Sequence, residues 1–364
     1  MVVDLLTPPA ATDPSAPAER SAGRRVLGRV LGRLVRLVLL LAAVAVASFA
    51  LMSASPVDPV DAYIGADLTA VGPEQRALIE ERWGLDDPAP ERFVKWAGQV
   101  LQGNLGESAV YGQPVADVLR ERLGPSLVLM ASAWLLSGAL GFGLGVLAGS
   151  RRGSWVDRTI TWWAYTIASA PTFWVGLLLL YVFAVWLQAA PVCCSGPIGV
   201  LPEDVTVLQR IQHLVLPALT LSLVGLGPAT LHTRQAVVEV LAEDHVTFAR
   251  ALGERPAGVL RLRVLRNAAA PALTLQFASI GELIGGSVLA EQVFRYPGLG
   301  QATTQAALRQ DVPLLLAIAL LTAVLVFVGN AVGDVVLRRV DPRTVPRDTR
   351  LPRPDRAAPA EVVR

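Results

Sequence analysis

Six long apolar runs constrain this chain more than any other feature of its sequence. They cover residues 34–52, 127–149, 160–187, 213–232, 273–293 and 313–336. A helix of about 20 apolar residues crosses the roughly 30 Å of hydrocarbon in a bilayer. The fourth run carries Pro217 and Pro228, which a membrane helix tolerates where neighbouring helices satisfy the freed backbone groups. The sequence therefore predicts an all-α integral membrane protein with six transmembrane helices.

Arginine is distributed unevenly among the segments that connect these runs. It clusters before residue 37, in the turn at 151–158, in the loop at 234–267 and after residue 337, whereas the segment 53–125 holds more acidic than basic residues. Connecting segments rich in Lys and Arg stay in the cytoplasm. We therefore expect cytoplasmic N and C termini, with the segment 53–125 outside.

The two ends of the chain lack the apolar pattern. The first residues are rich in Pro, Ala and Ser, and such a composition cannot bury enough apolar surface to order the chain. We expect a disordered cytoplasmic N-terminal extension at 1–26, one transmembrane domain at 27–345 and a disordered cytoplasmic tail at 346–364.

Composition excludes several classes of protein. Lys95 is the single lysine and lacks the glycine frame of a phosphate-binding loop, so the chain does not hydrolyse ATP by that route. Three histidines and two cysteines are too few and too scattered for a closed zinc site. The adjacent Cys193 and Cys194 are expected to be free, small hydrophobic residues. No spacing indicates a catalytic triad, and no basic stripe with interleaved aromatic residues indicates nucleic acid. We therefore expect no catalytic residues, no metal site and no cofactor bound by this chain.

Residues 244–274 lie between the fourth and fifth runs, yet they are too charged for lipid. Good helix formers surround Val246, Gly253 supplies the left-handed position that ends a helix, and Pro256 suits the first turn of the next. Leucine and valine then recur at helical spacing. The pattern predicts two short helices that form a compact knob, and a short amphipathic helix fits a groove on a partner protein.

This segment resembles the cytoplasmic EAA loop of ABC importer permeases, through which the membrane subunit binds its ATPase. The shared pattern is D-x-V-x-x-A-R-A-x-G followed by N-A-x-x-P, and the matching residues are Asp244, Val246, Ala249, Arg250, Ala251, Gly253, Asn267, Ala268 and Pro271. The Glu-Ala pair that names the motif is absent, since Thr247 and Phe248 precede Ala249. The resemblance implies a coupling loop at 234–272. Its ATPase-coupling residues would be Asp244, Ala249, Arg250, Ala251, Gly253, Asn267 and Pro271.

A second resemblance covers the outer segment. Residues 84–132 are similar, almost end to end, to the region after the first span in dipeptide, oligopeptide and nickel permeases. The matching residues include Gly84, Leu85, Pro88, Trp96, Gly103, Leu105, Gly106, Ser108, Pro114, Val115, Arg122 and Leu123. Asn104 stands where that family usually has Asp, and SPVDPV at 55–60 replaces its P-G-D-P. The outer segment is either a lid or a docking surface for a substrate-binding protein.

Shorter matches extend the resemblance over roughly residues 27–345. They are RRGSWVDR (151–158), HLVLPALTLSL (213–223), AEQVFRYPGLGQ (290–301), DVP (311–313) and VDPR (340–343). The resemblance implies the type I ABC importer permease architecture and a place in the cell membrane. The chain would form half of a translocation pathway for peptides, with nickel or another metal chelate as the alternative cargo.

The resemblance also implies a set of partners. They are a second homologous permease subunit, two cytoplasmic ABC ATPase subunits or domains that use ATP and Mg, and an extracytoplasmic substrate-binding protein. Two other classes fit less well. A secondary carrier would show internal repeats with paired broken helices, and a membrane enzyme would show clustered polar residues at one interface. We find neither pattern in the sequence.

The fifth run contains a polar stripe. Gln276, Ser279, Glu282 and Gly286 recur every three or four residues, which places them on one helical face. An ionised side chain within a membrane is costly and usually faces a partner or a water-filled path. We expect either that Glu282 lines the translocation path and favours cationic cargo, or that it makes a structural hydrogen bond to a neighbouring helix.

The outer end of the fifth run carries turn residues. Glu291 is followed by Pro297, Gly298 and Gly300 in the sequence YPGLG, and both Pro-Gly and Gly-Leu-Gly demand turns. By resemblance these residues form an outer gate. Loop geometry alone is the alternative explanation for the glycines.

Overall fold

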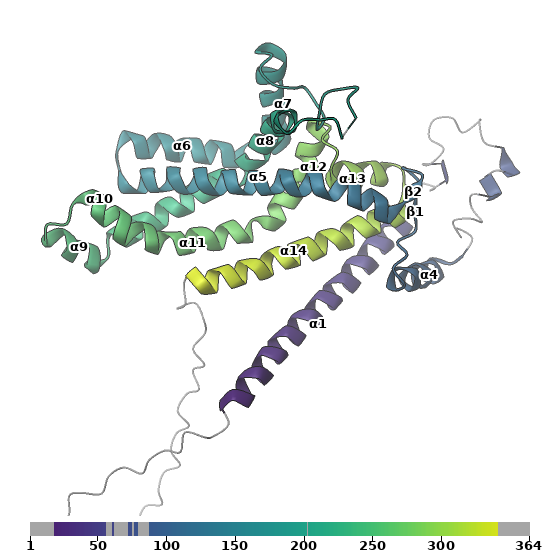
Figure 1. The fold of residues 1–364 in the computed structure, drawn as a ribbon, viewed down its shortest axis with the longest axis horizontal. Helices are drawn as coiled ribbons and strands as arrows, with labels where there is room; N and C mark the ends of the chain where they lie inside the picture. The colour runs from purple at the N-terminus through teal and green to yellow at the C-terminus, as the bar shows by residue number, and fades with distance from the viewer. Residues whose placement is uncertain are drawn as a thin grey trace, which may run out of the picture.

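The described chain is built almost entirely from helices, most of which run along the long axis of the molecule (Figure 1). The computed structural model describes residues 18–55, 60–61, 72–74, 76–78, 87–201 and 203–340, with the backbone alone for 18–27, 29–30, 338 and 340. Four helices are long and apolar enough to cross a membrane. They are α1 (Ala18–Ser53), α5 (Val115–Ser150), α8 (Val207–Leu241) and α14 (Val312–Val340). These helices correspond to the first, second, fourth and sixth predicted runs.

The third predicted run is broken near its middle. α6 (Trp155–Ser169) is followed by α7 (Thr172–Leu179) and the π-helical segment η1 (Leu180–Trp186), and the two parts are bent by 106°. The bend lies at Ala170 and Pro171, where Ala170 has φ −82° and ψ 135°. Proline has no backbone N–H, and its ring pushes the preceding residue out of the helical region.

The fifth predicted run is bent as well. α11 (Leu265–Ala278) and α12 (Ile280–Val293) meet at Ser279, and the segment Pro256–Ala278 makes an angle of 51° with α12. The Ser279 hydroxyl donates to the Gln276 carbonyl at 2.9 Å, and such back-bonding from serine is often accompanied by a bend. If each bent pair counts as one span, the described residues hold six spans, in agreement with the predicted number.

α8 is the central helix of the bundle, and α5 packs closely along it. Gly141, Gly145 and Gly149 of α5 follow one another at intervals of four residues. A Cβ atom at these positions would come within 2.6, 2.5 and 2.8 Å of side chains of α8. Small residues at this spacing let two helices approach closely within a membrane. The glycine series therefore sets the distance between the two helices.

α1 packs on α14 at the edge of the bundle. Arg33 Nη2 and Asp334 Oδ2 form an ion pair at 2.6 Å. α1 begins at Ala18, so the structure has residues 18–26 in a helix, whereas their composition predicts part of a disordered extension. Ala, Glu and Arg in this stretch are strong helix formers, and the helix continues directly into the first span. Residues 1–17 and the predicted tail at 346–364 lie outside the described residues.

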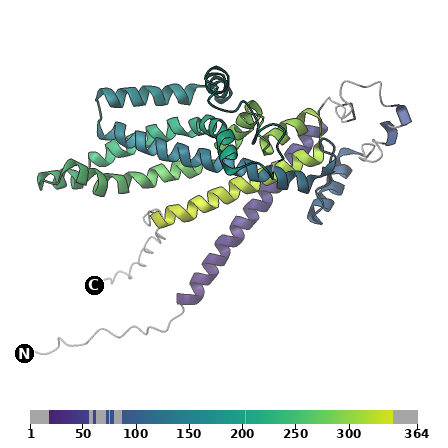
Figure 2. The same ribbon diagram turned by 45° about the horizontal axis from the view of Figure 1, so that its top comes forward.

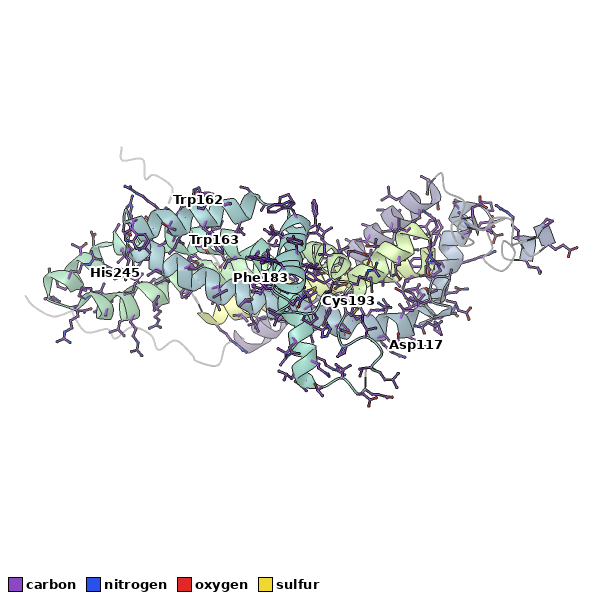
Figure 3. The ribbon with its side chains drawn as sticks, turned by 90° about the horizontal axis from the view of Figure 1, so that it is seen from above. Asp117, Trp162, Trp163, Phe183, Cys193 and His245 are labelled. Atoms are coloured by element: carbon purple, nitrogen blue, oxygen red, sulfur yellow. A yellow bond between two sulfur atoms is a disulfide. The ribbon has the colours of Figure 1, made fainter. Side chains whose placement is uncertain are left out.

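The two ends of the bundle carry different elements (Figures 1 and 2). One end carries α9 (Asp244–Ala251), α10 (Pro256–Val259) and the π-helical segment η2 (Leu260–Val264). The opposite end carries α4 (Ala89–Leu101), α13 (Leu299–Leu308) and an antiparallel hairpin of β1 (Glu107–Ser108) and β2 (Gln113–Pro114). In the hairpin Glu107 pairs with Pro114, and Ser108 pairs with Gln113. Figure 3 shows the same separation, with His245 of α9 at one end and Asp117 of α5 towards the other.

Candidate functional site

The predicted sequence of helix, break and helix is present at one end of the bundle. α9 ends just before Gly253, which takes a left-handed φ of 80°. The Gly253 N–H donates to the Arg250 carbonyl at 3.0 Å, and the Glu254 N–H donates to the Ala249 carbonyl at 3.1 Å. These bonds satisfy carbonyl groups that a helix end leaves unpaired. α10 then begins at Pro256, in the position that proline suits. We call residues 244–264 the knob.

A buried apolar cluster fixes the knob to the bundle. Val246 and Ala249 of α9 pack with Val259 and Val264, and Ala268 of α11 and the end of α8 complete the cluster. Each of these five side chains is at most 2% exposed. Protein interiors are close-packed and transmit strain. This cluster therefore joins α9 to α8 and α11.

The outward face of the knob is apolar. Phe248 of α9 is 66% exposed, and Leu252, the residue that caps the end of α9, is 69% exposed. Leu262 is exposed to a similar degree. Exposed apolar patches mark interaction surfaces. The predicted set of coupling residues omits all three side chains, although the spacing of Phe248 and Leu252 places them on one helical face.

The predicted coupling residues occupy both exposed and buried places. Asp244, Arg250, Ala251, Gly253, Asn267 and Pro271 are exposed, whereas Ala249 is buried. Asn267 lies on α11, where its Nδ2 donates to the Arg263 carbonyl at 3.0 Å. All of these residues except Ala249 are thus accessible to a partner. Ala249 belongs to the buried cluster that fixes the knob to the bundle.

The polar stripe of the fifth run is divided between two helices. Gln276 is buried in α11, where its side-chain Nε2 donates to the Trp134 backbone carbonyl at 2.7 Å. The backbone carbonyl of Gln276 accepts from Trp134 Nε1 at 2.8 Å. Glu282 is exposed on α12, and Gly286 packs against α8. The bend at Ser279 removes the single helical face on which the spacing places these four residues.

Three of the predicted gate residues meet around one buried carboxylate. Glu291, at the end of α12, is 0% exposed. Its carboxylate accepts hydrogen bonds from Ser126 Oγ at 2.6 Å and from the Gln301 N–H at 3.1 Å. A side chain at Gly298 would overlap the carboxylate, and one at Gly300 would press on it. The carboxylate therefore fixes the start of α13 to α5 and α12.

Pro297 lies half-buried in the turn between α12 and α13. Next to it, the Tyr296 N–H donates to the Glu291 carbonyl at 2.9 Å, and the Gly298 N–H donates to the Tyr296 carbonyl at 2.8 Å. The fold thus brings all four predicted residues into one turn. Their role as a gate stays a prediction.

A second buried carboxylate, Asp311, holds the hairpin of β1 and β2. Its Oδ2 accepts hydrogen bonds from Ser108 Oγ at 2.6 Å and from the Val110 N–H at 3.0 Å. The Tyr111 hydroxyl donates to Gln305 Oε1 at 2.7 Å. Burial raises the pKa of Tyr111 from a value that already leaves the hydroxyl protonated at neutral pH. The described part of the outer segment is therefore bonded directly to α13 and α14, a connection that the sequence match at 311–313 does not indicate.

Cys193 and Cys194 form a disulfide, so the prediction of two free cysteines is wrong. The Cys194 N–H donates to the Phe294 carbonyl at 2.9 Å, and His213 Nδ1 lies 2.8 Å from the Cys193 carbonyl. Cys194 has a positive φ of 75°. A residue other than glycine keeps such a conformation only where its surroundings hold it. The partners come from α8 and from the turn after α12, far from the cysteines in sequence.

Comparison with family models gives two matches that together cover most of the chain. The binding-protein-dependent transport system inner membrane component matches residues 141–346. The N-terminal part of the binding-protein-dependent transport system membrane component matches residues 24–127.

Individual relatives align along nearly their whole length. The oligopeptide transport system permease protein AppB of Bacillus subtilis (strain 168) is 34% identical over 315 residues, which cover 86% of this chain and 98% of AppB. The di/tripeptide transport system permease protein DppB of Pseudomonas aeruginosa (strain UCBPP-PA14) is 35% identical, with 81% and 92% covered. The dipeptide transport system permease protein DppB of Escherichia coli (strain K12) is 31% identical, with 88% and 97% covered.

Among solved structures, one of the MetNI methionine ABC transporter in an inward-facing conformation is similar to this chain. It covers 62% of this chain and 96% of the matched chain, at 18% identity and a TM-score of 0.49. The matched family models and the relatives together cover most of the chain. By both, the chain belongs to the family of binding-protein-dependent transport system inner membrane components, as a membrane-spanning permease subunit of an ABC transporter.

Proposed function

We propose that this chain forms half of the translocation pathway of an ATP-driven importer of peptides. The other half is a second homologous permease subunit. Two cytoplasmic ABC ATPase subunits or domains bind and hydrolyse ATP with Mg, and an extracytoplasmic substrate-binding protein delivers the cargo. In this proposal the chain itself binds no cofactor and catalyses no reaction.

The observation that carries the proposal is the division of α9 into two apolar faces. One face, with Val246 and Ala249, is buried against the bundle. The other face, with Phe248 and Leu252, is exposed. A short helix that is apolar on both sides needs a second covering surface, and a groove on a partner provides one. The match of this segment to an ATPase-coupling loop makes the ATPase the proposed partner.

Coupling would then be mechanical. The buried cluster under the knob joins α9 to α8 and α11, and α8 runs as one helix of 35 residues along the bundle. Movement of the knob would therefore displace helices that line the pathway, by rigid-body rotation. The ATPase can shift the equilibrium between inward-open and outward-open forms only if it contacts the knob differently in the two forms.

Orientation follows from charge and from the arrangement of the helices. The start of α1, the end of α14 and the knob lie towards the same end of the molecule (Figure 1). This end carries the arginine-rich connections, which favours a cytoplasmic location. We therefore place both termini and the knob in the cytoplasm, and α4, the hairpin and α13 on the outer side.

The proposed cargo is a peptide because the relatives named above are oligopeptide, di/tripeptide and dipeptide permeases. They give no support to nickel, the alternative cargo. Glu282 would attract the amino terminus of a peptide. In the described part of the chain no residue bonds to its side chain, so a structural hydrogen bond within this subunit is the weaker explanation. Gln276, Ser279 and Gly286 would shape the pathway indirectly, through the packing of α11 and α12.

The experiment that tests the proposal is purification of the complex, followed by ATP hydrolysis in proteoliposomes. Di- to oligopeptides and nickel chelates are supplied with the binding protein. Co-purification of ATPases and a second permease, with hydrolysis stimulated by peptides, is the expected result. Stimulation by nickel chelates alone would overturn the peptide cargo. Failure of any ATPase to co-purify with the intact knob would overturn the importer.

A further inference from the structure

An arginine-lined cavity opens beside the knob. It has a volume of about 510 Å³ and lies between the turn that joins α5 to α6 and the ends of α8 and α9. Arg151 and Arg152 line it from the turn, and Arg250 lines it from α9, with Ser154 and Leu241 between them. The turn lies within the family match, at RRGSWVDR (151–158), but that match assigns no role to its arginines. The cavity therefore needs an explanation of its own.

Within the described residues, no carboxylate neutralises the positive charge of the cavity. Arg151, Arg152 and Arg250 are all exposed, and in the part of the chain that the structure describes none of them forms an ion pair. The carboxylate of Asp157 is occupied, since it accepts two hydrogen bonds from Arg234, at 2.5 and 2.8 Å, and one from the Gly153 N–H at 2.8 Å. An anion that enters the cavity would meet three unpaired guanidinium groups, which can bind phosphate oxygens in pairs.

A second observation connects the cavity to the lipid surface. Glu243 follows Ala242 of the lining but does not itself line the cavity, and its Oε2 lies 3.0 Å from His245 Nδ1. On the opposite side, α6 starts at the rim with Trp155, which is 76% exposed, and Trp162 is 68% exposed two turns later. Figure 3 shows Trp162 on the edge of α6. Exposed tryptophan is typical of the interface between membrane and water. An apolar surface thus leads from the arginines along a membrane helix.

We propose that this cavity binds the headgroup of an anionic phospholipid. Arg151 and Arg152 contact the phosphate, Arg250 approaches it from α9, and the acyl chains lie along the exposed face of α6. Basic pockets of this kind on the cytoplasmic side are recognised by anionic headgroups. A protein carboxylate would also pair with the arginines, but it would give no reason for the tryptophans at the rim. Because Arg250 belongs to the knob, the bound lipid also stabilises the position of the knob relative to the bundle.

The test compares lipid binding by the full-length chain in nanodiscs that contain phosphatidylglycerol and phosphatidylcholine. Native mass spectrometry after mild release counts the retained lipids. The test variant is Arg151→Gln with Arg152→Gln. The control is Arg158→Gln with Arg339→Gln, which removes the same charge from two exposed arginines that do not line the cavity. Each basic residue at an anionic surface contributes about fivefold to binding, so we expect about 25-fold weaker retention of phosphatidylglycerol in the test variant alone.

Two further measurements separate the lipid from other anions. Inorganic phosphate at millimolar concentration is added to the wild-type chain, and co-purification of the ATPase is measured for the same variants. Equal retention of phosphatidylglycerol in the test and control variants overturns the proposal. The proposal is also overturned if free phosphate displaces the retained lipid while the wild-type chain shows no preference for phosphatidylglycerol over phosphatidylcholine. It is overturned as well if the test variant loses the ATPase while its lipid retention is unchanged. Lipid binding is measured without cargo, and its failure is thus distinct from failure of the transport function.

Discussion

The hydroxyl of Ser126 in α5 donates a 2.6 Å hydrogen bond to the buried carboxylate of Glu291 in α12. The same oxygen accepts a hydrogen bond from the Leu299 N–H at 2.7 Å, at the start of α13. One side chain therefore joins three helices at the end of the bundle that carries the hairpin. Both bonds are buried, so loss of the hydroxyl would leave a carboxylate and an N–H with fewer partners.

We expect Ser126→Ala to lower the free energy of unfolding by about 1–3 kcal/mol, the cost of a buried polar group that loses its partner. Thermal unfolding of the purified chain in detergent measures the effect. Ser132→Ala is the matched control, because the Ser132 hydroxyl bonds only to the Val128 and Leu129 carbonyls of its own helix. Equal losses in the two variants would show that the link between the helices contributes nothing.

The glycines of α5 allow a second matched pair of substitutions. A Cβ at Gly145 would lie 2.5 Å from Thr233 Cβ and 2.7 Å from the Thr230 carbonyl, whereas a Cβ at Gly143 would meet nothing within 4 Å. We expect Gly145→Ala to destabilise the chain by about 1–3 kcal/mol through overpacking. Gly143→Ala should be neutral or stabilising, since alanine favours a helix. A chain that tolerates both changes equally would contradict the close contact of α5 and α8.

Much of the fold could be predicted because its signals are local. Runs of apolar residues predict spans wherever they occur, and Gly253 and Pro256 mark the break in the knob without reference to the rest of the chain. The series Gly141, Gly145, Gly149 indicates close helix packing by its spacing alone, although no prediction was made from it. Helix propensity also explains why α1 begins at Ala18, although the composition of the N-terminal extension indicates disorder.

The rest depends on partners that are distant in sequence. Gln276 bonds to Trp134, and Asp311 bonds to Ser108, across separations of 142 and 203 residues. No periodicity indicates such pairs. The predicted polar face failed for a related reason, because helical spacing assumes a continuous helix and the chain bends at Ser279.

The apolar face of the knob can be removed without disturbing its anchor. Phe248 and Leu252 are exposed, so Phe248→Ser with Leu252→Ser should leave the fold intact, and surface changes of this kind usually alter stability by less than about 0.5 kcal/mol. We expect this variant to lose at least about tenfold in ATPase co-purification, since exposed apolar residues at the centre of an interface contribute most of its binding energy. Leu308→Ser is the control, because Leu308 is 75% exposed at the opposite end. Full ATPase retention by the knob variant would rule out this face as the contact.

The disulfide between Cys193 and Cys194 predicts a simple count of thiols. Disulfides persist in oxidising compartments, and the proposed orientation puts this loop outside. Alkylation of the denatured chain, purified without reductant, should label neither cysteine, and prior reduction should allow both to be labelled. Mass spectrometry of the peptide that contains them gives the count. Thiols labelled before reduction would contradict the bond.

Substitution of Glu282 tests whether the pathway favours cargo with a positive charge. Its side chain is exposed on α12, so Glu282→Gln removes the negative charge with little change in shape. We expect uptake of a dipeptide with a free amino terminus to fall about fivefold, the effect of losing ~1 kcal/mol from one charge pair. Uptake of the N-acetylated peptide should not change between wild type and variant, because that cargo carries no cation. A structural role would instead lower the uptake of both peptides together, and unchanged uptake of both at every pH would remove Glu282 from the pathway.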